Sequence, residues 1–156
     1  MPLQTGQTSP ENEIAAAMVV ALQANETLDE PEIHIDNPID IDVAIEEMEF
    51  GHLLLDVWPY GIKQERLNRR HDEYTFEVHL GVRSKLKTVT RADVDTLCFY
   101  RDAAQKTFGI HYTITLADDT TVHLVESEPF APYGRKMLHG SGLFVAPIRF
   151  AWKARR

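Results

Sequence analysis

The chain has 156 residues, of which 44% are hydrophobic, and its formal net charge is -8. That length and composition suit a single domain with a buried core. The acidic balance does not fit a general nucleic-acid binder, and no run of about 18 apolar residues predicts a membrane span.

The charge is distributed unevenly along the chain. Residues 1–62 contain 13 acidic residues and no Lys or Arg, whereas residues 63–156 contain 16 basic and 11 acidic residues. One interpretation is that the two regions pack on each other or are solvated. The other is that an acidic face of one subunit meets a basic face of a neighbour, because complementary potentials set register and orientation at interfaces.

Two features bear on the compartment in which the chain assembles. Cys98 is the only cysteine, so an intrachain disulfide is excluded and a reducing, cytoplasmic assembly site is expected. The N-terminus lacks a basic segment followed by an apolar one, so no signal peptide is expected.

Residues 1–8 are expected to form a flexible tail, and a helix is predicted to follow. Ser9 suits the N-cap position and Pro10 the first helical position, and acidic residues occupy the first turn. The helix is expected to end near Asn25. Its apolar stripe consists of Ile14, Met18, Val19 and Leu22.

The acidic segment after this helix has weaker patterns. Polar and apolar residues alternate over 32–36, which predicts a short strand, and Asn37-Pro38 breaks it. Residues 43–48 could form one helical turn.

Two strands are predicted on either side of a long polar segment. The leucine-rich stretch 53–58 indicates an inner strand buried on both faces and stopped by Pro59. Clean alternation over 73–82 indicates a half-buried antiparallel strand that is polar on its other face. The intervening residues 59–72 are expected to form a long loop, and long loops inside compact domains are usually functional or disordered.

The second half of the chain predicts a helix, a hairpin and a final strand. Thr90 with Asp93 resembles a capping box that opens a helix running to Phe108. Residues 110–124 then predict a β-hairpin, and 128–141 a Pro- and Gly-rich loop. In the last strand, Pro147 predicts a sheet edge or a bulge, because proline cannot donate a ladder hydrogen bond.

This order predicts an α+β domain over residues 9–156, with a mainly antiparallel sheet of about four to five strands and two helices packed on one face. The alternation of apolar residues also predicts the core. Its expected members are Leu55, Val57, Phe76, Val78, Leu97, Ile114, Ile148 and Phe150.

Sites for chemistry are few. The acidic cluster at 32–42 could hold a hard cation, but its spacing does not match a Ca²⁺-binding loop, so a solvated acidic face or an acidic interface is preferred. Histidines show no metal-ligand spacing, although His79, His111 and His123 could form a pH-sensitive patch if they faced one sheet surface. No phosphate-binding or nucleophile motif occurs. We therefore expect no catalytic residue, no cofactor and no metal.

The basic run at 63–70 contains the first cations of the chain. It could be a solvated loop, a contact to an acidic protein surface, or a contact to nucleic acid. These alternatives cannot be separated by the local sequence, since four cations in eight residues make only a modest basic patch.

The order of motifs resembles the tail terminator, or tail-completion, proteins of long-tailed bacteriophages. An N-terminal helix leads to LLLDVWPYG and the charged KQERLNRRHDEY, and an alternating strand follows in YTFEVHLGV. A helix in VDTLCFYRDAAQKTF precedes a hairpin and VESEPFAPYGRKML. The chain closes on GLFVAPIRFAWKAR. The resemblance covers residues 10–156 and is poorest over 25–50.

The resemblance implies a non-enzymatic virion subunit assembled in the host cytoplasm. It implies a homo-oligomeric ring, a hexamer, that contacts the tail tube protein and the head-completion or connector protein. DNA would pass through the lumen without sequence-specific binding, and no membrane is involved. The residues expected at contacts between subunits or rings are Lys63, Arg66, Arg69, Arg70, Asp36, Asp40, Asp42, Arg135 and Lys136.

Two alternatives remain open at this point. The chain could be another neck or minor tail component, such as a head-completion ring. It could also be a small metal-dependent enzyme that uses the acidic 32–42 cluster.

Overall fold

The structure is a computed structural model. The structure describes residues 9–28, 32–35, 50–51, 53–66, 72–129 and 135–155. The expected N-terminal tail at 1–8 and the expected helical turn at 43–48 lie outside this part of the chain.

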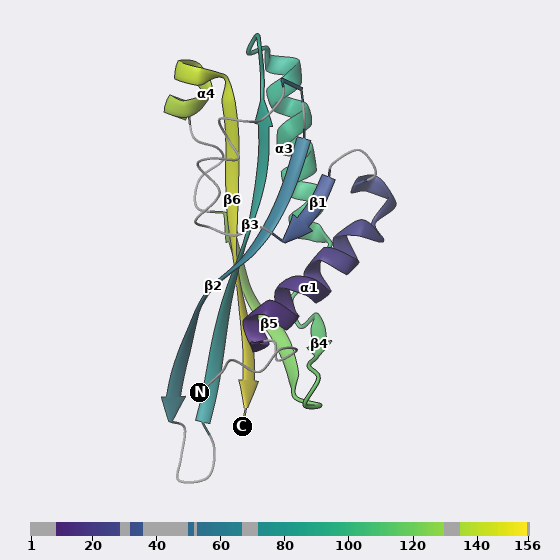
Figure 1. The fold of residues 1–156 in the computed structure, drawn as a ribbon, viewed down its shortest axis with the longest axis vertical. Coiled ribbons are helices and arrows are strands. Elements are labelled where there is room, and N and C mark those ends of the chain that lie inside the picture. The colour runs from purple at the N-terminus through teal and green to yellow at the C-terminus, as the bar shows by residue number, and fades with distance from the viewer. Residues whose placement is uncertain are drawn as a thin grey trace, which may run out of the picture.

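One twisted sheet organises the fold (Figure 1), which is α+β as predicted. Its strands run in the order β1-β2-β3-β6-β5-β4, and neighbours are antiparallel except for the parallel pair β1 and β2. The sheet has six strands where four to five were predicted, because the short strands β1 and β4 also pair with it at its two edges. The strand bounds are β1 Glu32–Ile35, β2 Leu53–Arg66, β3 Asp72–Lys85, β4 Thr113–Thr115, β5 Thr121–Pro129 and β6 Leu143–Arg155.

The two long helices begin at the predicted caps. In α1, Pro10–Gln23, the Ser9 side chain accepts a hydrogen bond from the Asn12 backbone N–H. In α3, Arg91–Lys106, Thr90 Oγ1 accepts from the Asp93 N–H and donates to the Asp93 carboxylate at 2.8 Å. These side chains satisfy N–H groups that have no partner inside a helix. No helix among the described residues is long and apolar enough to cross a membrane.

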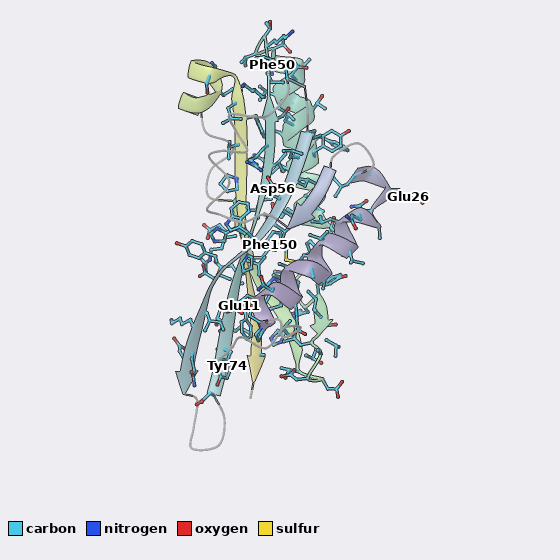
Figure 2. All side chains as sticks on the ribbon, viewed as in Figure 1. Glu11, Glu26, Phe50, Asp56, Tyr74 and Phe150 are labelled. Atoms are coloured by element: carbon cyan, nitrogen blue, oxygen red, sulfur yellow. The ribbon has the colours of Figure 1, made fainter. Side chains whose placement is uncertain are left out.

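Both helices pack on one face of the sheet. Alternate side chains of β3 and β6 point to that face and form a single core with the buried stripes of α1 and α3. All eight predicted core residues are buried there, from 0% exposure for Val57 to 8% for Ile114. Figure 2 marks Phe150 near the middle of the sheet.

The predicted loop at 59–72 is wrong over most of its length. Strand β2 continues through Pro59 to Arg66 and pairs with β3 up to Asp72. The register shifts between Pro59 and Gly61, which makes Tyr60 the extra residue of a β-bulge. Bulges and sheet edges are where strands tolerate proline, so Pro59 bends β2 without ending it.

Three further predictions need correction. The loop predicted at 128–141 contains α4, Arg135–Ser141, and β5 extends to Pro129. Strand β3 is polar on its second face, as predicted, but it is not half-buried, because His79 and Arg83 on that face are buried. The prediction for Pro147 is also wrong, because β6 lies between β3 and β5 and pairs with β3 through Pro147 without a bulge. Among the described residues β5 pairs with β6 only from Ile148 onward, so Pro147 lies just beyond the end of that pairing.

Truncation of a buried ring tests this core. We expect Phe76→Ala and Phe150→Ala each to lower the free energy of unfolding by about 3–5 kcal/mol, since each leaves a cavity. Phe99→Ala is the matched control, because Phe99 is 55% exposed and its loss should cost within about 0.5 kcal/mol. Urea denaturation measures all three. Equal costs for Phe150 and Phe99 would mean that the faces of β6 are assigned incorrectly.

Candidate interaction surface

The sheet face opposite the helices carries polar groups whose pairing the sequence did not predict. Near its centre, Arg83 Nε donates to Asp56 Oδ2, and both side chains are almost completely buried. Asp56 lies on β2, and Arg83 lies diagonally across from it on β3, since Asp56 pairs with Gly81. Figure 2 places Asp56 midway along the sheet. This pair joins the two strands by charge where a hydrophobic contact would be usual.

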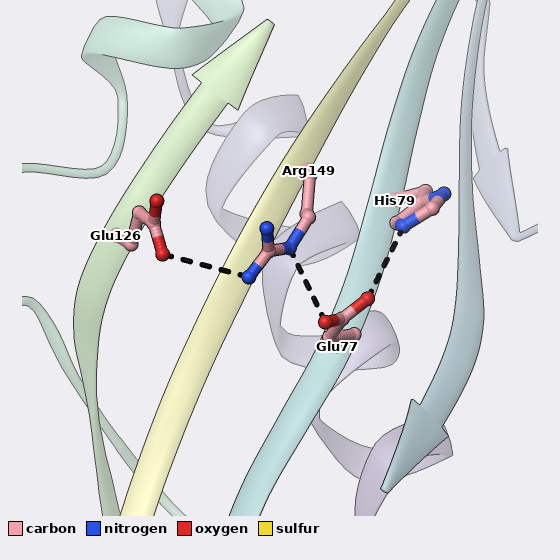
Figure 3. A network of polar contacts seen from close by, with 4 residues as sticks. All are labelled: Glu77, His79, Glu126 and Arg149. Carbon is pink, nitrogen blue, oxygen red and sulfur yellow. Dashed lines mark hydrogen bonds and ion pairs between the residues drawn. The ribbon is translucent and has the colours of Figure 1, made fainter. Parts of the chain in front are cut away.

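A second polar network crosses three strands of the same face (Figure 3). Arg149 of β6 lies between two carboxylates: its Nη2 is 3.5 Å from Glu126 Oε2 on β5, and its Nε is 3.3 Å from Glu77 Oε1 on β3. The other Glu77 oxygen is 3.7 Å from His79 Nε2. The network therefore ties β5, β6 and β3 together through one guanidinium group.

Aromatic rings cover the histidine end of this network. The Tyr60 ring stacks on His79 with centroids 4.2 Å apart, and Trp58 meets the same imidazole edge-on at 5.8 Å. The bulge positions Tyr60 for this contact. Gly81 makes room for Trp58, because a Cβ at Gly81 would lie 3.0 Å from the indole ring.

The pKa of His79 is lowered from its ordinary value. Burial is the main cause, because it disfavours the charged imidazolium. The carboxylate of Glu77 raises the pKa and Arg149 lowers it, and burial outweighs the favourable carboxylate. At neutral pH the imidazole is therefore uncharged, and the 3.7 Å contact to Glu77 is not an ion pair under that condition.

The end of β2 and the start of β3 form an extension that we call the arm, residues 59–66 and 72–78. It projects beyond α1 at the lower left of Figure 1. Tyr60 is 68% and Ile62 is 51% exposed on it. Lys63 forms an exposed ion pair with Glu65 at 2.6 Å, which raises the pKa of Lys63 and lowers that of Glu65.

The structure places only part of the predicted contact set. Lys63 is exposed on the arm, the backbone of Arg66 ends β2, and the backbones of Arg135 and Lys136 begin α4. The remaining predicted residues lie outside the described part of the chain, and these are Asp36, Asp40, Asp42, Arg69 and Arg70. The assignment of these nine residues to contacts stays a prediction.

The predicted histidine patch is not formed by all three residues. His79 is buried on the helix-free face, and His123 pairs with Lys153, which places it on the same face but farther along the sheet. His111 has φ 70° and belongs to the turn before β4. Among the described residues, no group of three or more His, Cys, Asp or Glu side chains could hold a metal ion.

Comparison with known proteins shows little. No family model matches the sequence, and no curated protein matches it. One solved structure aligns over 96% of both chains at 12% sequence identity and a TM-score of 0.47. A likeness at that level carries no inference about function.

The buried pair gives one prediction. We expect Arg83→Met to lower the free energy of unfolding by about 3–5 kcal/mol, because the buried Asp56 carboxylate loses its cation. The double variant Arg83→Met with Asp56→Leu should recover most of that loss. Arg149→Met is the control on the same face and should cost less, since its side chain is 29% exposed and water can solvate the carboxylates. Chemical denaturation provides the comparison, and a double variant as unstable as Arg83→Met would contradict it.

His79 gives a pH-dependent prediction. Its folded-state pKa is lowered, so below about pH 6.5 the unfolded chain binds a proton that the folded chain does not. The free energy of unfolding should therefore fall as the pH drops from about 6.5 towards the folded-state pKa. The parent should lose more stability than His79→Gln over this interval in thermal or urea unfolding. Parallel pH profiles for the two proteins would show that His79 is not responsible.

Proposed function

We propose that this chain is a structural virion subunit whose homo-oligomeric ring ends the tail tube of a long-tailed phage and joins the tail to the head connector. The order of sequence motifs that resembles tail terminator proteins supports the proposal. The α+β fold found here is the fold class expected from that resemblance. The proposed role is non-enzymatic and uses no cofactor.

The observation that carries the proposal is the arm. A ring subunit must contact two neighbours in the ring and a further component on each side of it. Such contacts need surface that reaches beyond the subunit core, on a rigid support. The arm continues the sheet, because its β2 part pairs with β3 and its β3 part pairs in turn with β6 as far as Arg155. Its exposed side chains include Tyr60, Ile62 and Lys63.

The charge distribution supports the same proposal. The cations of 63–70 begin on the arm, where Lys63 is exposed, and no cation precedes them in the sequence. A head-to-tail contact between different faces closes into a ring when its rotation closes. An acidic face from the first 62 residues and the cations of 63–70 would provide two such complementary faces.

Two alternatives predict different results. Another neck or minor tail component would share the arm and the charge distribution, but its loss would leave tail length controlled. A metal-dependent enzyme would need the acidic 32–42 cluster, so Asp36→Ala or Asp42→Ala would remove a metal-dependent activity.

Particles assembled without this protein provide the direct test. Electron microscopy should show tails of uncontrolled length, or tails detached from heads, and complementation with the parental chain should restore complete particles. Native mass spectrometry of the purified chain should show either rings or subunits that assemble only on tails. Normal particles in the absence of the protein would overturn the proposal.

The cations of the 63–70 run give a residue-level prediction. The triple variant Arg66→Glu, Arg69→Glu and Arg70→Glu should weaken association between subunits or rings in sedimentation experiments and reduce head-to-tail joining. Its free energy of unfolding should stay within about 0.5 kcal/mol for each surface change.

The matched control reverses three exposed cations outside the arm, Lys87→Glu, Arg91→Glu and Lys106→Glu. It carries the same total charge change as the first variant. If both variants weaken joining equally, net charge and not the 63–70 run is responsible. If neither variant weakens joining, the assignment of the 63–70 cations to contacts is wrong.

A further inference from the structure

Among the described residues, only part of the outer edge of β2 is paired with another strand. Strand β1 pairs with Leu54–Val57. Beyond Val57, the structure places no described strand on the outer side of β2, although β2 continues to Arg66. An uncovered strand edge presents backbone N–H and C=O groups to another chain, and proteins commonly blunt such edges with bulges, prolines and charges.

Pro59 and the bulge at Tyr60 interrupt only the first part of this edge. From Gly61 onward β2 pairs with β3 without another register shift, ending at the pair Arg66 and Asp72. Residues 61–66 are therefore regular, and among the described residues no strand pairs with their outer side. Ile62 on this edge is half exposed. Such a length is enough for a short antiparallel pairing with a second strand.

The charges of Lys63 and Glu65 on this edge are complementary to those of the same edge in a second, antiparallel copy. Lys63 and Glu65 are two residues apart, so they lie on the same face of the sheet, and their side chains are 71% and 55% exposed. If two identical strands pair antiparallel about Gln64, Lys63 of each copy lies directly opposite Glu65 of the other. Pairing about Lys63 or about Glu65 would instead place like charges opposite each other, which is unfavourable.

We propose that two copies of this chain pair antiparallel along residues 62–66 of β2, with the register centred on Gln64. The contact is isologous, because the same patch is used on both copies, and it closes as a two-fold dimer. The dimer goes beyond the proposed ring, whose contacts are head-to-tail. If the ring also uses the arm, the free chain must release this pairing before it can assemble.

Charge reversal tests both the surface and its register. We expect Lys63→Glu alone, and Glu65→Lys alone, to raise the dimer dissociation constant about tenfold, since each places like charges opposite each other twice. Sedimentation equilibrium over a range of concentrations measures this constant. Lys87→Glu, an exposed reversal outside the arm, should leave it unchanged.

Mixing the two reversed chains gives the sharper measurement. Lys63→Glu carries two acidic groups on this edge and Glu65→Lys carries two basic groups, so an equimolar mixture should form a mixed dimer with parental affinity. The Lys63–Glu65 pair within the chain is lost in both variants. Recovery on mixing therefore reports contact between chains and not repair of either subunit.

Three results would overturn the proposal. One is a parental chain that is monomeric at every concentration or forms rings without a dimer. The second is a dimer whose dissociation constant does not respond to either reversal. The third is a mixture that associates no better than its components, with thermal melting showing both variants folded. None of these results bears on the particle experiment, so failure of the dimer and failure of the ring are distinguishable.

Discussion

The alternation of side chains along β3 is the constraint on which the rest of the structure depends. This strand pairs with β2 on one side and with β6 on the other. Its even-numbered residues, such as Phe76 and Val78, face the helices and form the core, while its odd-numbered residues face the other side. A shift of one residue in register would exchange the two sets, so the apolar face fixes the positions of His79 and Arg83.

That constraint explains why the second face combines burial with charge. Arg83 is fixed in a central strand, and Asp56 is the carboxylate that β2 presents beside it. Farther along the sheet, Arg149 of β6 forms ion pairs with Glu77 of β3 and Glu126 of β5, so one cation links three strands. Buried ion pairs contribute little net stability. Separating the two partners is costly, however, so such a pair favours the strand pairing that brings both partners together.

The arm follows from the same sheet. Strands β2 and β3 are longer than the layer of helices that covers them, and β1 covers only a short part of β2. The uncovered length presents exposed side chains and a backbone edge, which are the features that contacts between chains use. The proposed ring and the proposed dimer both draw on this surface, although they require different symmetry.

The sequence by itself determined the two long helices, the core and the α+β class, because these depend on local caps and on the period of apolar residues. Ser9, Thr90 and the alternating Phe76 and Val78 illustrate this. Tertiary structure alone decided the bulge that carries β2 past Pro59, the burial of His79, and the pairing of Arg149 with Glu77 and Glu126. These features depend on which strands are neighbours and in what register, and residues far apart in sequence fix both.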